Sequence, residues 1–128
     1  MAHPIVLISH FTIKPGKLDD LKGLAQEVAT RLEAEKPQTL VFLDYLDDKG
    51  TQVTFVHMFA GPEAMDLHFG GAQERSREAF EFMEPKGWEI YGRPSAAALG
   101  TMRQAATSAG VPLTIHPEYL AGFVRLAG

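Results

Sequence analysis

Hydrophobic and polar residues alternate in some parts of this chain and recur every three or four positions in others. Residues 4–14 (PIVLISHFTIK) carry their larger apolar side chains at alternate positions, which predicts a β-strand. Residues 17–36 carry an apolar stripe at helical spacing, with Asp19 and Asp20 in the first turn, and Pro37 follows. This pattern predicts an amphipathic helix that ends before the proline.

The next part of the chain predicts three more strands around a second helical region. Residues 38–46 (QTLVFLDYL) and 51–60 (TQVTFVHMFA) are rich in β-branched and aromatic residues and are separated by a short polar loop, as in a hairpin. Pro62 suits the first position of a helix, which Gly70-Gly71 interrupts. We expect this helical region to continue to about Met83 and to end at Glu84-Pro85, before a fourth strand at 87–93.

The predicted order is strand, helix, strand, strand, helix, strand. This order is typical of an α+β protein with a ferredoxin-like subunit, in which helices cover one face of an antiparallel sheet. We assign residues 1–93 to this core and 94–128 to a C-terminal appendage of the same domain. The appendage is expected to hold a helix at about 95–109, ended by Gly110, and an extended piece at 111–116.

Both faces of the predicted sheet are apolar. In the third strand, Val53, Phe55 and Phe59 share one side with His57, while Val56, Met58 and Ala60 occupy the other. Because two helices cover only one face, the other would expose a large apolar surface. A sheet-to-sheet homodimer would bury that surface. The alternative is that the C-terminal appendage folds over it.

Composition limits the classes of partner and chemistry. The 128 residues include 12 basic and 16 acidic ones, for a net charge of −4, and no basic run that would suit nucleic acid. There is no cysteine, which excludes disulfides and thiolate catalysis. We recognise neither a signal peptide nor an apolar run long enough to span a bilayer. We therefore expect a cytoplasmic protein that does not associate with a membrane.

Histidines are the main candidates for chemistry. His68 lies on the apolar side of the second helical region, where a histidine in a dry pocket could take a proton from a phenol or hydroquinone. The alternative is a structural histidine inside the core. His57 and His10 lie on different strands, and without the strand register we do not assign them to one cavity. Metal-binding spacing is absent, so no metal site is predicted.

Aromatic residues complete the predicted ligand pocket. If a small apolar or aromatic ligand binds beside His68, we expect it to contact a set of mostly aromatic residues: His57, Phe59, Phe69, Trp88 and Tyr91. Aromatic residues on strands also serve as core or interface residues, and this alternative stays open. Arg75 and Arg77 could hold an anion, but mixed charge on a helix more commonly faces solvent.

Two short motifs resemble the antibiotic biosynthesis monooxygenase-like family. The segment 11–17 (FTIKPGK) resembles the strand-to-helix entry of that family, and 59–68 (FAGPEAMDLH) resembles its later strand, helix start and helix histidine. The resemblance covers a core of about 90 residues. It implies a ferredoxin-like subunit that dimerises into an α/β barrel, and it matches His68 to the helix histidine of the family.

Activities within this family differ. The resemblance implies either a cofactor-free monooxygenase that acts on a small aromatic, quinol or polyketide-like compound, or a non-catalytic dimer that binds a small ligand or serves as a scaffold. Haem-degrading members use an asparagine and a tryptophan near the ligand. This chain has no asparagine, and its single tryptophan, Trp88, lies in the predicted fourth strand. Haem binding is therefore disfavoured, and no cofactor is expected.

Overall fold

Five strands and four helices make up residues 3–125, the part of the chain that the computed structural model describes. In chain order they are β1 (Ile5–Ile13), α1 (Leu18–Glu35), β2 (Thr39–Leu46), β3 (Gln52–Phe59), α2 (Pro62–Phe69), α3 (Ala72–Ala79), β4 (Met83–Tyr91), α4 (Ala96–Ala109) and β5 (Leu113–His116). Gly71 begins α3 with a φ of 80°, a left-handed conformation that glycine adopts without strain, so the predicted break at Gly70-Gly71 is confirmed.

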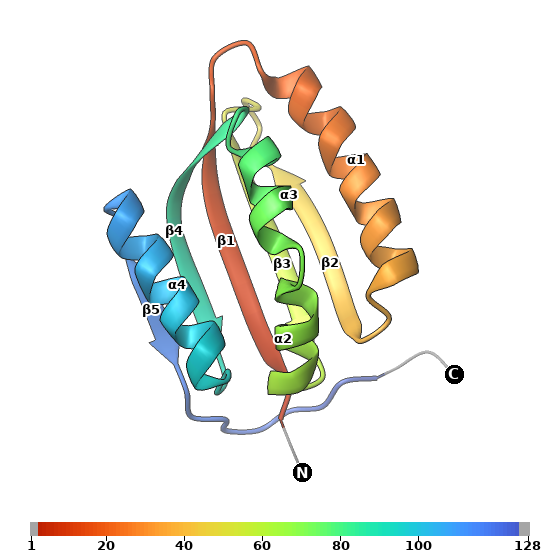
Figure 1. The fold of residues 1–128 in the computed structure, drawn as a ribbon, viewed down its shortest axis with the longest axis vertical. Coiled ribbons are helices and arrows are strands. Elements are labelled where there is room, and N and C mark those ends of the chain that lie inside the picture. Colours follow the sequence, from red (N-terminus) through yellow and green to blue (C-terminus); the bar gives the residue numbers. More distant parts are fainter. Residues whose placement is uncertain (1–2, 126–128) are drawn as a thin grey trace.

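The strands form one sheet in the order β2-β3-β1-β4-β5 (Figure 1). The first four strands pair antiparallel, which confirms the α+β, ferredoxin-like class. The fifth strand departs from the expected purely antiparallel sheet, because β5 pairs in parallel with β4. The intervening helix α4 provides the crossover that a parallel pair requires.

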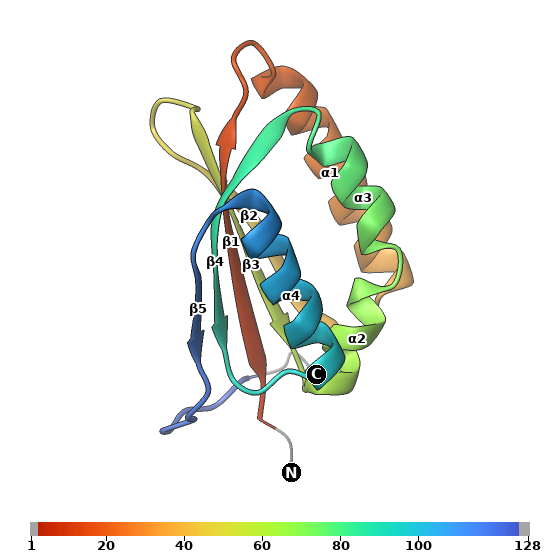
Figure 2. The ribbon, with the colours of Figure 1, turned by 60° about the vertical axis from the view of Figure 1, so that its left-hand side comes forward.

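All four helices lie on one side of the sheet (Figure 2). Helix α4 joins the same core through Ala98, Met102 and Ala106, and β5 extends the sheet at its edge. The alternative in which the appendage covers the second face is therefore wrong. We call that second surface the helix-free face; its residues include Val6, Ile8, His10, Leu43, Tyr45, Thr54, Val56, Met58, Glu89 and Tyr91.

Strand β1 contributes side chains to both faces of the sheet. Its residues Ile5, Leu7, Ser9, Phe11 and Ile13 are buried beneath the helices, whereas the residues that alternate with them are half-buried or exposed. This alternation is the one predicted from the sequence. Because the side chains of a strand alternate in direction, the register between β1 and its neighbours determines the face on which each histidine lies.

The segment between α3 and β4 differs from its prediction. Helix α3 ends at Ala79, and Met83 already begins β4, so Glu84-Pro85 lies inside the strand instead of ending a helix. The pairing of β1 with β4 shifts between His10 and Phe11, which leaves Lys86 as an extra residue in a bulge. Strand β5 pairs only with Trp88–Tyr91, so Pro85 has no neighbour on that side and its missing N–H is tolerated.

Helix α1 directs its apolar stripe toward the sheet. Leu21, Leu24 and Leu32 are buried, and Asp19 and Asp20 occupy the first turn, where they complement the helix dipole. Among residues 3–125, no helix combines the length and the apolar character that crossing a membrane requires.

Candidate functional site

A cavity of about 610 Å³ lies between the helices and the covered face of the sheet. Its wall is mostly aliphatic and aromatic, and its few polar groups come from separate elements. Helix α1 supplies the aliphatic wall with Leu21, Leu24, Val28 and Leu32. The sheet supplies most of the rings together with Asp44 and His57, while His68 comes from α2 and Arg75 from α3. A largely apolar cavity with a few polar groups is typical of a site for a small organic ligand. The rings are Phe11, Phe42, Phe55, Phe69, Phe80 and Trp88, and the ionisable residues are Asp44, His57, His68 and Arg75.

His57 and His68 meet in the wall of this cavity. Their ring centroids are 5.2 Å apart, and the rings are nearly perpendicular. His57 Nδ1 lies 3.2 Å from the carbonyl oxygen of Leu7, and His68 Nδ1 lies 2.8 Å from the hydroxyl of Thr39. Because a carbonyl only accepts, Nδ1 of His57 carries the hydrogen of that bond, and a neutral His57 has its lone pair on Nε2.

Both histidines are neutral at pH 7. Burial lowers the pKa of His68 to about 3, and the nearby His57, Arg75 and Lys36 add to this effect. Burial also lowers the pKa of His57 to about 4, against the opposing hydrogen bond to Leu7. A neutral ring can accept a hydrogen bond from a ligand at its free nitrogen, but such a low pKa makes each ring a weak proton acceptor.

The C-terminal end of α2 is held by two cations. Arg75 donates hydrogen bonds to the carbonyls of His68 (2.7 Å) and Gly70 (3.1 Å), and Lys36 donates one to the carbonyl of Leu67 (2.8 Å). These carbonyls carry the negative end of the helix dipole. Arg75 therefore fixes the backbone of His68, although the sequence favoured a solvent-facing role for this arginine.

The structure brings four of the predicted ligand-contacting residues to one region. Phe69 and Trp88 line the cavity with His57. Phe59 is fully buried, and its ring centroid lies 5.0 Å from that of His68, so it supports the histidine from beneath. The polar group that the sequence missed is Asp44 on β2, which also lines this cavity.

Asp44 was detectable in principle. Its side chain points to the covered face of the sheet, since Asp44 pairs with Phe55 and Phe42 pairs with His57, and both partners lie on that face. A charged residue at an inward position of an otherwise apolar strand is a signal for a functional carboxylate. To use that signal, one must know which residues of the strand point inward. A bulge between Thr39 and Val41 changes this alternation within the short strand, so the sequence alone does not reveal it.

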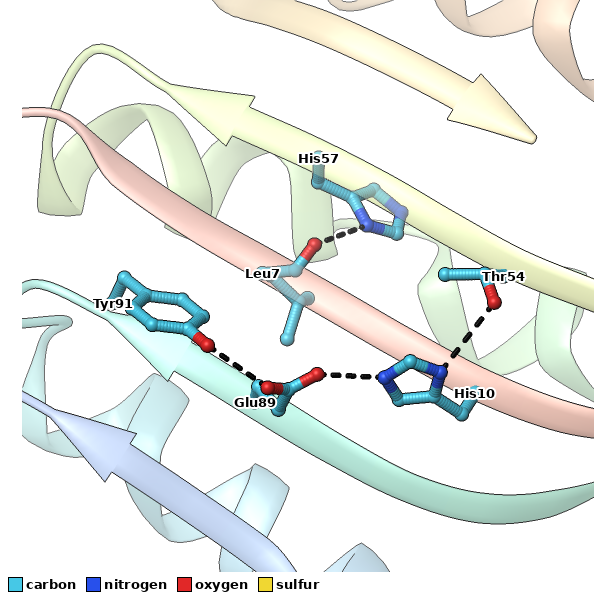
Figure 3. Close-up of polar contacts among 6 residues, drawn as sticks. All are labelled: Leu7, His10, Thr54, His57, Glu89 and Tyr91. Atoms are coloured by element: carbon cyan, nitrogen blue, oxygen red, sulfur yellow. Dashed lines mark hydrogen bonds and ion pairs between the residues drawn. The ribbon is translucent and has the colours of Figure 1, made fainter. Parts of the chain in front are cut away.

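Tyr91 lies apart from the other predicted ligand-contacting residues, on the helix-free face. Its hydroxyl donates a hydrogen bond of 2.8 Å to Glu89, and its ring stacks on His116 at 4.7 Å. The same carboxylate pairs with Nε2 of His10 at 2.6 Å (Figure 3). His10 therefore does not share the cavity of His57 and His68, because the sheet separates them.

No group of three or more His, Asp or Glu side chains suits a metal ion within residues 3–125. The cavity brings together the imidazoles of His57 and His68, the carboxylate of Asp44 and the hydroxyls of Ser9, Ser76 and Thr101. Such a set can hydrogen-bond a ligand and exchange protons with it.

No protein-family model and no curated protein sequence matches this chain. Solved structures do match its fold. MupZ from Pseudomonas fluorescens has a TM-score of 0.71 at 16% identity, over 96% of this chain and 95% of its own. SnoaB, a cofactor-independent oxygenase from Streptomyces nogalater, has a TM-score of 0.60 at 11% identity, over 74% of this chain and 97% of its own.

A protein from Caulobacter crescentus CB15, named as a candidate antibiotic biosynthesis monooxygenase, matches with a TM-score of 0.62 at 16% identity, over 70% of this chain and 88% of its own. The resemblance drawn from the two sequence motifs is thus confirmed at the level of the fold. The chain has the α+β fold of the antibiotic biosynthesis monooxygenase-like proteins. At these identities the likeness concerns the fold, and any activity must be argued from the cavity itself.

Proposed function

We propose that this protein is a cofactor-free monooxygenase that oxidises a small phenolic or hydroquinone-like compound in the cavity. The observation that carries the proposal is the enclosure of two neutral histidines and a carboxylate in an aromatic cavity of about 610 Å³. The oxygenase SnoaB shares the fold and supports the reaction class.

The reaction requires a substrate anion that is rich in electrons. Loss of a hydroxyl proton gives such an anion, which transfers electrons to O₂ without a metal. The overall change balances when a ring CH₂, the keto form of a phenolic CH, becomes C=O. One oxygen atom enters the product, and the other leaves as water with the two hydrogens of that carbon.

His68 is proposed to touch the substrate through its free ring nitrogen. Because its pKa is about 3, we assign it the holding of a substrate hydroxyl by accepting a hydrogen bond, in place of the proton abstraction that the sequence suggested. Thr39 and Arg75 act as positioning residues, since one bonds its ring and the other its carbonyl.

Oxygen consumption tests this function directly. The purified chain is mixed with a panel of hydroquinones and anthrone-like phenols, and O₂ uptake is followed against heat-denatured protein. Uptake that falls at least tenfold in His68→Ala, with unchanged folding by circular dichroism, is the expected result. Equal rates for both variants across the whole panel would reject the role of His68.

The weak basicity of both histidines also fits a second function, the binding of a small aromatic ligand without turnover. Native mass spectrometry of freshly purified protein separates the two. A retained small molecule that survives exposure to O₂ unchanged supports binding, whereas its conversion to a product heavier by one oxygen and lighter by two hydrogens supports the oxygenase.

We also propose that a second copy of the chain covers the helix-free face. This face presents half-buried Val56 and Met58 beside Leu43 and Tyr45, which are 47% and 61% exposed. A continuous apolar surface on a sheet is costly in water. Two copies meeting through this face would close two sheets into the barrel that the sequence resemblance implies.

A further inference from the structure

One carboxylate oxygen in the cavity has no partner. Asp44 Oδ1 is buried and makes no hydrogen bond within the described residues, and none of the ion pairs found there includes Asp44. It is the one buried side-chain oxygen or nitrogen in residues 3–125 left in this condition. A buried polar atom without a partner costs free energy, so its presence in a cavity wall points to a ligand that supplies the missing donor.

The surroundings of Asp44 define the chemistry of that donor. Asp44 pairs with Phe55 across the sheet and lies two residues from Phe42 on the same side of β2, so aromatic rings flank the carboxylate. The titratable groups that share the cavity are His57 on β3, His68 on α2 and Arg75 on α3, while α1 contributes only aliphatic residues. The two histidines are neutral, and Arg75 is engaged with backbone carbonyls.

We propose that Asp44 is a catalytic residue that accepts the proton of a hydroxyl on an aromatic substrate. The proposal rests on the proposed function and specifies its substrate: a phenol or hydroquinone whose hydroxyl faces β2. The substrate O–H bond breaks, a new O–H bond forms on the carboxylate, and the phenolate keeps the electron pair. The proton later goes to the oxygen atom that leaves as water.

The relative basicities of the cavity groups support this assignment. Burial raises the pKa of Asp44 to about 7. A phenol has a pKa of about 10, so transfer to Asp44 is less unfavourable than transfer to His68, whose pKa is about 3. A base with a pKa near the working pH is also the most effective one.

The first measurement is the rate of O₂ uptake by Asp44→Asn. Asparagine keeps the shape and the hydrogen-bond acceptor but takes no proton at neutral pH. We expect a loss on the order of 10²-fold in rate, and a wild-type profile that rises with pH through about 7. Asp48→Asn, the same change on the exposed β2–β3 loop, is the matched control. An unchanged rate and pH profile in Asp44→Asn would overturn the proposal.

The second measurement does not depend on turnover. Trp88 is the only tryptophan of the chain and lines the cavity, so quenching of its fluorescence reports binding. Wild type should bind hydroquinone about tenfold more tightly than 1,4-dimethoxybenzene, which lacks the donor hydrogens, and Asp44→Leu should lose this preference.

The two measurements separate failure of the proposal from failure of the proposed function. If wild type consumes no O₂ with any substrate, the oxygenase is rejected, while loss of the hydroxyl preference in Asp44→Leu still supports Asp44 as the hydroxyl-binding group. A preference that is unchanged in Asp44→Leu, or absent in wild type, overturns the proposal whatever the oxygen consumption.

Discussion

The polar residues on the two faces of the sheet differ in whether their hydrogen-bonding groups have partners within the chain. On the covered face, His57, His68 and Asp44 are enclosed among aromatic rings, and Asp44 retains an oxygen without a partner. On the helix-free face, His10, Glu89 and Tyr91 bond one another. Unpaired polar groups in a cavity remain available to a ligand, whereas mutually bonded ones are already satisfied. The difference places the expected chemistry on the covered face.

The largest expected effect is the loss of stability when a core side chain is truncated, compared with truncation of its neighbour on the other face. Phe59 is fully buried in the core beneath His68, whereas Met58 is half-buried on the helix-free face. Phe59→Ala should lower the free energy of unfolding by about 3–5 kcal/mol because it leaves a cavity in a packed core. Urea denaturation at a fixed protein concentration measures the loss.

Met58→Ala is the matched comparison, since it truncates a neighbouring side chain that points the other way. In a free subunit it should cost only about 1 kcal/mol, because the side chain is half-solvated. If a second copy covers the face, the cost should grow with protein concentration. Equal losses for both variants at every concentration would contradict the distinction between the faces.

The next effect concerns assembly. Val56 lies on β3 at the middle of the helix-free face, between Ile8 of β1 and Leu43 of β2. Val56→Lys should weaken a dimer through this face at least about 100-fold, because it buries an unpaired charge. Sedimentation velocity over a dilution series measures it. The control is Leu67→Lys at an exposed position of α2 on the other side of the sheet, which should leave the dissociation constant unchanged. A wild-type chain that sediments as a monomer at all concentrations would contradict the dimer itself.

The contrast between the faces was only partly accessible from the sequence. The alternation in β1 and the apolar stripe of α1 predicted the core, because period and burial are directly linked. The division of the histidines was not accessible, because it depends on which residue of β1 faces which residue of β3. A shift of one residue between the two strands would bring His10 and His57 onto the same face.

The start of β4 and the place of Asp44 escaped prediction for a related reason. Pro85 is a helix-ending signal by local rules, yet the bulge at Lys86 and the short reach of β5 let it lie in a strand. Asp44 looked like an ordinary charged residue before the hairpin loop. Only the pairing with Phe55 showed that it points inward.

A smaller effect follows from the neutral histidines of the covered face. Their folded pKa values, about 4 and 3, lie below the ordinary value of 6.5, so the unfolded chain binds more protons between these limits. Stability is therefore complete above pH 6.5 and is lost as the pH falls toward 4. Replacing His68 with glutamine should remove part of this loss, on the order of 2–3 kcal/mol at pH 4 relative to pH 8. Denaturant titrations of both proteins across this range measure the slopes.

Asp44 acts in the opposite direction in the same experiment. Its folded pKa of about 7 exceeds the ordinary 3.8, so the folded chain binds its proton more tightly and this contribution is lost as the pH rises from about 4 to 7. Both proteins retain Asp44, so its contribution to stability cancels when His68→Gln is compared with wild type. Parallel curves for the two proteins would show that His68 is not held neutral by burial.

The smallest effect is expected on the helix-free face. The bonds from His10 and Tyr91 lower the pKa of Glu89, so its contribution is present at neutral pH and is lost on acidification below its ordinary value of 4.5. Because His10 and Glu89 are partly exposed in the single chain, Glu89→Gln should cost less than about 1 kcal/mol at protein concentrations low enough to keep the chain monomeric, and the cost should shrink in high salt. Thermal unfolding at low and high salt tests this. A cost equal to that of Phe59→Ala at a concentration where the chain is monomeric would contradict the exposure of this cluster, whereas a cost that grows with protein concentration would place the cluster between two copies.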